Sequence, residues 1–157
     1  MSRFWPFLLL AFCGAAWAAT SCRFATGIPG VAFGTYDVVS ALPTDTQLRV
    51  DVQCTRDGGP PNVTVSLGIS QGLHGTSTTD RRMRNAAGDV MSYGLFLDSA
   101  RSAVWGTTHG VDTGSLTLTI PNRTTASGSF LVFGRIPPRQ NVSPGSYSDS
   151  LQLVVSP

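Results

Sequence analysis

Short runs in which apolar and polar residues alternate recur along most of the chain, and they limit the fold more than any other sequence feature. Leu48, Val50 and Val52 alternate with polar residues before Cys54, and a similar run follows the glycine- and proline-rich turn 57–61. A period of two residues is typical of strands with one buried face. These two runs are interpreted as neighbouring half-buried strands joined by that turn. Further runs are expected at residues 63–67, 91–97, 116–120, 130–134 and 151–155.

The composition disfavours helices. All 11 basic residues are Arg and all nine acidic residues are Asp, so the chain lacks Lys and Glu, two strong helix formers. Gly (17 residues) and Pro (10 residues) separate the alternating runs. Short strands at this spacing predict an all-β chain, and they favour a β-sandwich.

The first 18 residues have the features of a secretory signal peptide. Arg3 precedes an apolar run over residues 4–13, and Ala16-Trp17-Ala18 offers a small-x-small cleavage signal. The apolar run is about half the length that a membrane-spanning helix needs, so no membrane span is predicted. We expect cleavage before Ala19, export through the periplasm, and one domain over residues 19–157.

Two cysteines remain after signal removal. Cys13 leaves with the signal peptide, and Cys22 and Cys54 stay in an oxidising compartment. Because one pairing is possible, we predict a Cys22–Cys54 disulfide that stabilises the domain.

No motif in the chain indicates catalysis. His74 and His109 lie in glycine-flanked loops without metal-ligand spacing, and we interpret them as exposed loop residues. Nucleophile, phosphate-loop and dinucleotide motifs are missing from the sequence. The near-neutral mature chain gives no electrostatic argument for nucleic-acid or membrane binding. We therefore predict no catalytic residue, no cofactor and no metal, and a protein that is not an enzyme.

Arg81, Arg82 and Arg84 form a local basic cluster. We interpret it as a solvated strand edge or loop, where Arg also discourages unwanted strand pairing. A contact with an acidic partner or a surface glycan is the alternative.

Trp105, Tyr36 and Tyr93 are interpreted as anchors of the core or of the sandwich rim. A platform on which sugar rings stack is the alternative, since aromatic rings combine a broad apolar surface with a polar end.

The order of landmarks along the mature chain resembles the spore coat protein U family, whose other members include pilin subunits of the archaic chaperone-usher pathway. The landmarks are Cys22 before Phe33-Gly34-Thr35-Tyr36, Cys54 ending a strand, Arg82-Met83 before Tyr93-Gly94-Leu95-Phe96-Leu97-Asp98, Trp105-Gly106, Phe133-Gly134-Arg135-Ile136, Gln140, and Gly145-Ser146-Tyr147-Ser148-Asp149 before the final strand.

This resemblance implies an immunoglobulin-like, pilin-type sandwich that lacks its seventh strand. In the family, a periplasmic chaperone fills the resulting groove, and an extension of another pilin subunit replaces it at an outer-membrane usher. The implied assembly groove lies beside the final strand, marked here by Leu151, Leu153 and Val155. The implied location is the cell surface, in a pilus or coat, or the extracellular space.

The chain departs from shaft pilins in one respect. After signal cleavage, Ala19-Thr20-Ser21 alone would precede Cys22, whereas polymerising pilins carry a donor segment there. We therefore expect a subunit at a fibre end, or a coat-like protein. A self-contained sandwich that binds surfaces or carbohydrates is the alternative function.

Overall fold

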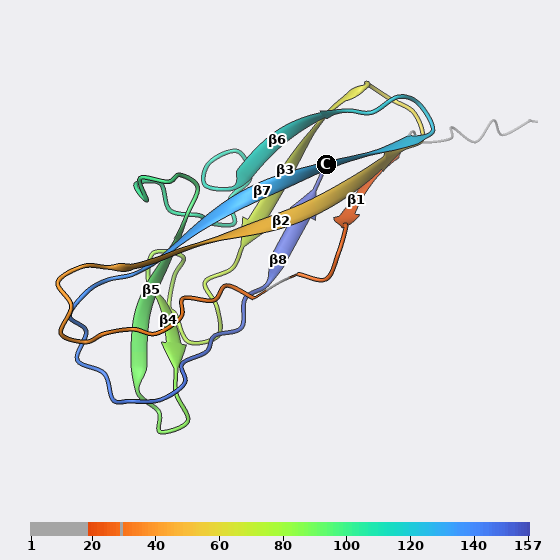
Figure 1. Ribbon diagram of the computed structural model, residues 1–157. Helices are drawn as coiled ribbons and strands as arrows, with labels where there is room; N and C mark the ends of the chain where they lie inside the picture. The colour runs from red at the N-terminus through yellow and green to blue at the C-terminus, as the bar shows by residue number, and fades with distance from the viewer. Residues whose placement is uncertain (1–18, 29) are drawn as a thin grey trace, which may run out of the picture.

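The computed structural model describes residues 19–28 and 30–157, and within them the chain forms strands and loops without a helix (Figure 1). The prediction of an all-β fold is therefore confirmed. The predicted signal peptide, residues 1–18, lies outside the described residues. The strands are β1 (Thr20–Phe24), β2 (Thr44–Arg56), β3 (Asn62–Ile69), β4 (Arg81–Arg84), β5 (Val90–Phe96), β6 (Gly114–Thr119), β7 (Thr124–Ile136) and β8 (Leu153–Ser156).

Two antiparallel sheets form the sandwich. The larger sheet has the order β1-β2-β7-β5-β4, and the smaller has the order β6-β3-β8. The strands β2 and β7 are the longest elements of the larger sheet, and they pair from Thr44↔Ile136 to Arg56↔Thr124. They form the long central pair of the larger sheet in Figure 1.

The core lies between the sheets and follows the alternation of the sequence. In β2, Val50, Val52 and Cys54 are at most 1% exposed, while the residues between them are only half-buried. Trp105 is 1% exposed, packs edge-on against Phe130 with ring centroids 6.2 Å apart, and donates its indole N–H to the Leu67 carbonyl at 2.8 Å. This burial matches the period-two pattern.

The interpretation of the runs 48–54 and 63–67 as neighbouring half-buried strands was wrong, because the two strands do not pair with each other. β2 belongs to the larger sheet and β3 to the smaller one, because β1 and β7 occupy both edges of β2. The 57–61 turn therefore crosses between the layers. Arg56, which is 8% exposed, holds this crossing by donating to the carbonyls of Gly58 and Ile120 at 3.0 and 2.6 Å.

β3 is also more deeply buried than a half-buried strand. Its residues from Val65 to Ile69 are all buried, so both of its faces are covered at that end. The loop 106–113 covers the outer face: a Cβ on Gly68 would stand 3.5 Å from the Thr107 backbone and 3.7 Å from the Thr113 side chain.

Candidate functional site

The two sheets each end in a strand with one partner at the same side of the sandwich. β1 pairs with β2, and β8 pairs with β3. Neither strand has a second partner among the residues that the structure describes. The two strands approach one another, with Cα atoms within 8 Å, but belong to different sheets (Figure 1).

The backbone of β8 faces alternately toward β3 and toward its open edge. The Ser70 N–H donates to the Gln152 carbonyl at 2.9 Å, so Gln152 and every second residue after it face β3. Leu153 and Val155 therefore direct their N–H and C=O groups to the open edge. Consistent with this register, Ile69, the partner of Leu153, donates its N–H away from β8, to the Gly106 carbonyl.

β1 has the complementary arrangement. Ala25 donates its N–H to the Asp51 carbonyl at 2.9 Å, which makes the odd-numbered residues of β1 the ones that bond to β2. Cys22 and Phe24 therefore direct their backbone groups to the open edge. The two edges together offer donors and acceptors to any strand placed between them.

The side chains at these edges are apolar and half-buried. Phe24, Leu151, Leu153 and Val155 pack against the core without being fully covered. Half-buried apolar side chains beside unpaired backbone groups are features of a template for strand addition.

The Cys22–Cys54 disulfide is present, with an S–S distance of 2.02 Å. Cys22 and Cys54 are direct partners in the β1–β2 register, and Cys54 is fully buried. The bond therefore ties the β1 edge covalently to the centre of the larger sheet.

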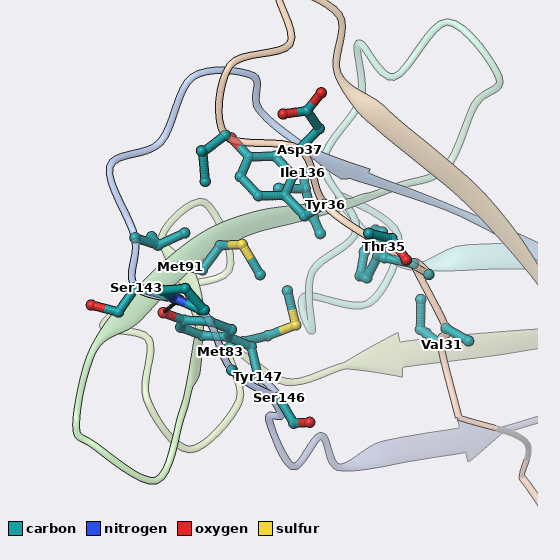
Figure 2. Close-up of a pocket in the computed structure, with 17 residues that line it drawn as sticks. Val31, Thr35, Tyr36, Asp37, Met83, Met91, Ile136, Ser143, Ser146 and Tyr147 are labelled. Carbon is teal, nitrogen blue, oxygen red and sulfur yellow. Dashed lines mark hydrogen bonds between the residues drawn. The ribbon is translucent and has the colours of Figure 1, made fainter.

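A pocket of about 760 Å³ lies beyond the β1 and β8 ends. Its walls are the segment 31–38, which follows β1, and the segment 142–147, which precedes β8. Figure 2 shows Met83 and Met91, from β4 and β5, lying between these segments. The same two stretches of chain that carry the open edges thus also enclose this pocket.

Sequence reasoning missed this pocket. Met83 and Met91 are 8% and 5% exposed, and Tyr36 and Tyr147 also line the pocket. The alternation around Met91 predicted a strand, but the coil segments opposite it carry no periodic pattern. Their position is a consequence of tertiary packing.

Among the predicted final-strand residues, Leu153 and Val155 belong to β8, but Leu151 precedes it. The expected start of the strand was wrong by two residues. Gln152 donates its N–H to the Ser70 hydroxyl at 2.9 Å in place of a backbone carbonyl, so the regular ladder begins one residue later.

The interpretation of Arg81 as a surface residue was also wrong. Its side chain is 0% exposed, whereas Arg82 is half-buried and Arg84 is exposed. Alternation explains the difference, because Arg81 and Met83 share the inward face of β4. Burial lowers the pKa of the Arg81 guanidinium, and the nearby Tyr93, Asp149 and Asp112 oppose that shift.

The aromatic residues contribute to packing. Trp105 and Tyr93 are 1% and 6% exposed, which leaves no ring face for a sugar. Burial raises the pKa of Tyr93 far above its ordinary value, and its hydrogen bond to Asp149 acts in the same direction. Tyr36 is half-buried at the pocket, with its hydroxyl donating to the Pro137 carbonyl and accepting from the Gln140 N–H.

The two histidines lie apart from these features. His109 is exposed and His74 is half-buried. Across residues 19–28 and 30–157, no group of three or more His, Cys, Asp or Glu side chains could hold a metal ion. The described chain also contains no helix long and apolar enough to cross a membrane.

Comparison with known proteins identifies relatives over most of the chain. Protein U of Myxococcus xanthus is 34% identical over 149 residues, which cover 87% of this chain and 77% of the relative. A chaperone–tip adhesion subunit complex of archaic chaperone-usher Csu pili from Acinetobacter baumannii has a similar fold, with 18% identity and a TM-score of 0.55. A chaperone–tip adhesin complex of CFA/I fimbriae aligns with 10% identity and a TM-score of 0.45.

The two solved chains are much longer than this one. The alignments cover 87% and 88% of this chain but 39% and 41% of the solved chains. The model of the spore coat protein U domain matches residues 9–154, nearly the whole sequence. With this match and a relative 34% identical over most of its length, the chain belongs to the spore coat protein U domain family.

Proposed function

We propose that this protein is an exported structural subunit of a bacterial surface pilus or coat, and that it assembles by accepting a β-strand from another chain. The observation on which this proposal mainly rests is the pair of open edges, β1 and β8, at one side of the sandwich. In this proposal the partner strand pairs with Leu153 and Val155 on one side and with Cys22 and Phe24 on the other. Its alternate apolar side chains complete the core.

The chemistry of the site favours a strand over other ligands. An extended chain can satisfy the outward N–H and C=O groups of both edges at once, and alternate side chains can enter the half-buried apolar surface. Natural proteins seldom leave such an edge uncovered, because it invites aggregation. In this proposal a periplasmic chaperone covers the edge first, and a pilin donor strand replaces the chaperone at an outer-membrane usher. The edge is then never left exposed.

The fold relationship with a chain of the Csu chaperone–tip adhesion subunit complex supports this proposal, and so does family membership. The position within a fibre is part of the proposal as well: with β1 paired to β2 from Thr20 onward, the described N-terminal segment is engaged in its own sheet. We therefore propose an accepting subunit at a fibre end, or a coat component.

A tethered strand tests the proposal. A flexible linker and an alternating apolar segment are fused after Pro157, and thermal unfolding is measured for the fused and unfused proteins. Tethering gives an effective concentration of about 1 mM, so a strand with a Kd of about 1 µM would add about 4 kcal/mol. For a domain of this size that corresponds to a rise in Tm of roughly 10 °C or more.

The control is the same fusion with Asp at each apolar position of the added segment, which keeps the backbone but removes the side chains that enter the core. We expect no rise in Tm for this control. Equal Tm values for all three proteins, in protein that is already monomeric, would show that the sandwich is complete alone. The self-contained adhesive or carbohydrate-binding module would then be the better account.

A further inference from the structure

Arg81 forms an unusual buried site at the start of β4. Its guanidinium donates to the carbonyls of Ser70, Ile69 and Trp105, at 2.8, 2.8 and 2.7 Å. A fourth bond joins it to the Thr78 carbonyl at 2.8 Å. One fully buried cation therefore collects acceptors from the end of β3, from the 70s loop and from the segment after β5.

Asp149, which is half-buried and lies just before β8, makes the second connection. It accepts a hydrogen bond from the Tyr93 hydroxyl at 2.6 Å, and others from the N–H groups of Leu73 and Ser150 at 2.8 and 2.9 Å. The 70s turn is shaped to admit this carboxylate. Gly72 has a φ of +87°, and a Cβ there would lie 1.9 Å from an Asp149 oxygen.

Ser70 links the Arg81 site to the segment that contains Asp149. Its carbonyl is held by Arg81, while its N–H donates to the Gln152 carbonyl and its hydroxyl accepts from the Gln152 N–H, both at 2.9 Å. Tyr93 is on β5 and Arg81 on β4, so both connections are anchored in the larger sheet. They converge on residues 149–152, the segment that leads into β8.

We propose that Arg81, Tyr93, Asp149 and Ser70 act together as a clamp that positions the accepting strand β8 before any partner strand arrives. This inference rests on the proposed function, since it assigns the clamp a role in strand acceptance. β8 is four residues long and has one partner strand, β3, among the described residues. A strand that short needs another anchor to hold its edge in register, and the clamp supplies it at the strand's N-terminal end.

The chemistry of the clamp is better suited to positioning the backbone before β8 than to raising the stability of the whole domain. A buried charge costs desolvation energy that its hydrogen bonds largely offset, so its net contribution to stability is small, although its removal would leave the buried carbonyls without donors. What a multidentate guanidinium adds is geometry, because its donors point in fixed directions. Here those directions fix the backbone at Ser70, which in turn fixes Gln152.

The test is hydrogen–deuterium exchange on the unfused protein, resolved to the amides of Val154 and Ser156, which face β3. The variants are Tyr93→Phe, which removes one hydroxyl and keeps the ring, and Asp149→Ala. We expect these two amides to exchange at least about tenfold faster in both variants, while the amides of β2 and β7 change much less. Asp149→Asn, which keeps an acceptor for Leu73, should restore part of the protection.

Asp98→Asn is the matched control. Asp98 also accepts from a backbone N–H, that of Ser102 at 2.8 Å, but it lies in a loop away from β8. The Asp98→Asn substitution should leave the exchange rates of the β8 amides unchanged. Unchanged β8 exchange in Tyr93→Phe and Asp149→Ala, or an equal increase in every strand, would overturn the clamp.

A second arm separates this inference from the proposed function. The Tyr93→Phe substitution is placed in the strand-fused protein, where the added strand should hold β8 from its open side and restore the lost protection. If fusion has no effect on any protein, the proposed function fails, yet the exchange of the unfused variants still decides whether the clamp holds β8.

Discussion

At the scale of single residues, Arg81 and Arg84 show how far position along a strand outweighs residue type. Both belong to a run that looks uniformly basic, but they lie on opposite faces of β4. Alternation alone would have separated them had β4 been recognised as a strand. Four residues with three arginines carry too little apolar pattern for that. Thr78 lies three residues before Arg81, but the other three carbonyl partners, Ser70, Ile69 and Trp105, lie 11, 12 and 24 residues away in the sequence.

This contrast gives a prediction for the arginines. Arg84→Ser should change the free energy of unfolding by less than about 0.5 kcal/mol, as is usual for exposed positions. Arg81→Ser should cost at least about 3 kcal/mol, because it leaves several buried carbonyls without donors, each at about 1–3 kcal/mol. Urea unfolding of the two variants checks this. Similar small losses for both would mean that Arg81 is not held as described.

At the scale of elements, the strands that sequence reasoning predicted best are those with long, regular alternation. β2, β5 and β7 contain predicted runs, and the Cys22–Cys54 bond followed from cysteine count and compartment. The assignment of strands to sheets could not be predicted in the same way. A turn such as 57–61 is compatible with a hairpin or with a crossing between layers, and the choice depends on which edges of β2 other strands occupy.

The candidate site was only partly predictable for the same reason. Leu153 and Val155 could be identified because the final alternation is regular and near the end of the sequence. Phe24 could not, because one apolar residue beside Cys22 forms no pattern. The pocket residues Met83 and Val142 come together only in the folded chain.

The open edge of β8 gives a prediction at this scale. Val155→Pro removes an N–H that faces away from β3, so it should spare the β3 pairing but weaken an added strand. Pro is tolerated at strand edges for this reason. In the strand-fused protein we expect Val155→Pro to lose at least half of the Tm gain, measured against its own unfused form.

Val155→Ala is the control for this substitution. It removes more of the side chain but keeps the N–H, so it should lower both Tm values while preserving most of the gain. If the Pro and Ala variants keep the same gain, the partner strand does not bond to the β8 edge.

At the scale of the whole molecule, the open side of the sandwich is narrower than an inserted strand requires. Neighbouring strands lie about 4.8 Å apart, so two strands that flank a third are separated by about 9.6 Å. Cα atoms of β1 and β8 come within 8 Å. The edges must therefore part at their closest approach before a strand can enter.

The covalent structure indicates which edge moves. The Cys22–Cys54 bond fixes β1 to the larger sheet, whereas β8 is held by hydrogen bonds to β3 and by the segment before it. Opening is thus expected to move β8 and not β1. Because opening comes before pairing, binding should be limited by a conformational step of the protein itself.

This order of events predicts slow and saturable association with a strand supplied as a separate peptide. With a fluorescent alternating apolar peptide in excess, the observed rate should level off as peptide concentration rises, with an apparent association rate constant below about 10⁴ M⁻¹s⁻¹ at low concentration. Fluorescence anisotropy after mixing measures it, and the same peptide with Asp at its apolar positions should not bind. A rate that rises linearly through about 10⁶ M⁻¹s⁻¹ would mean that the edges already stand far enough apart to receive a strand.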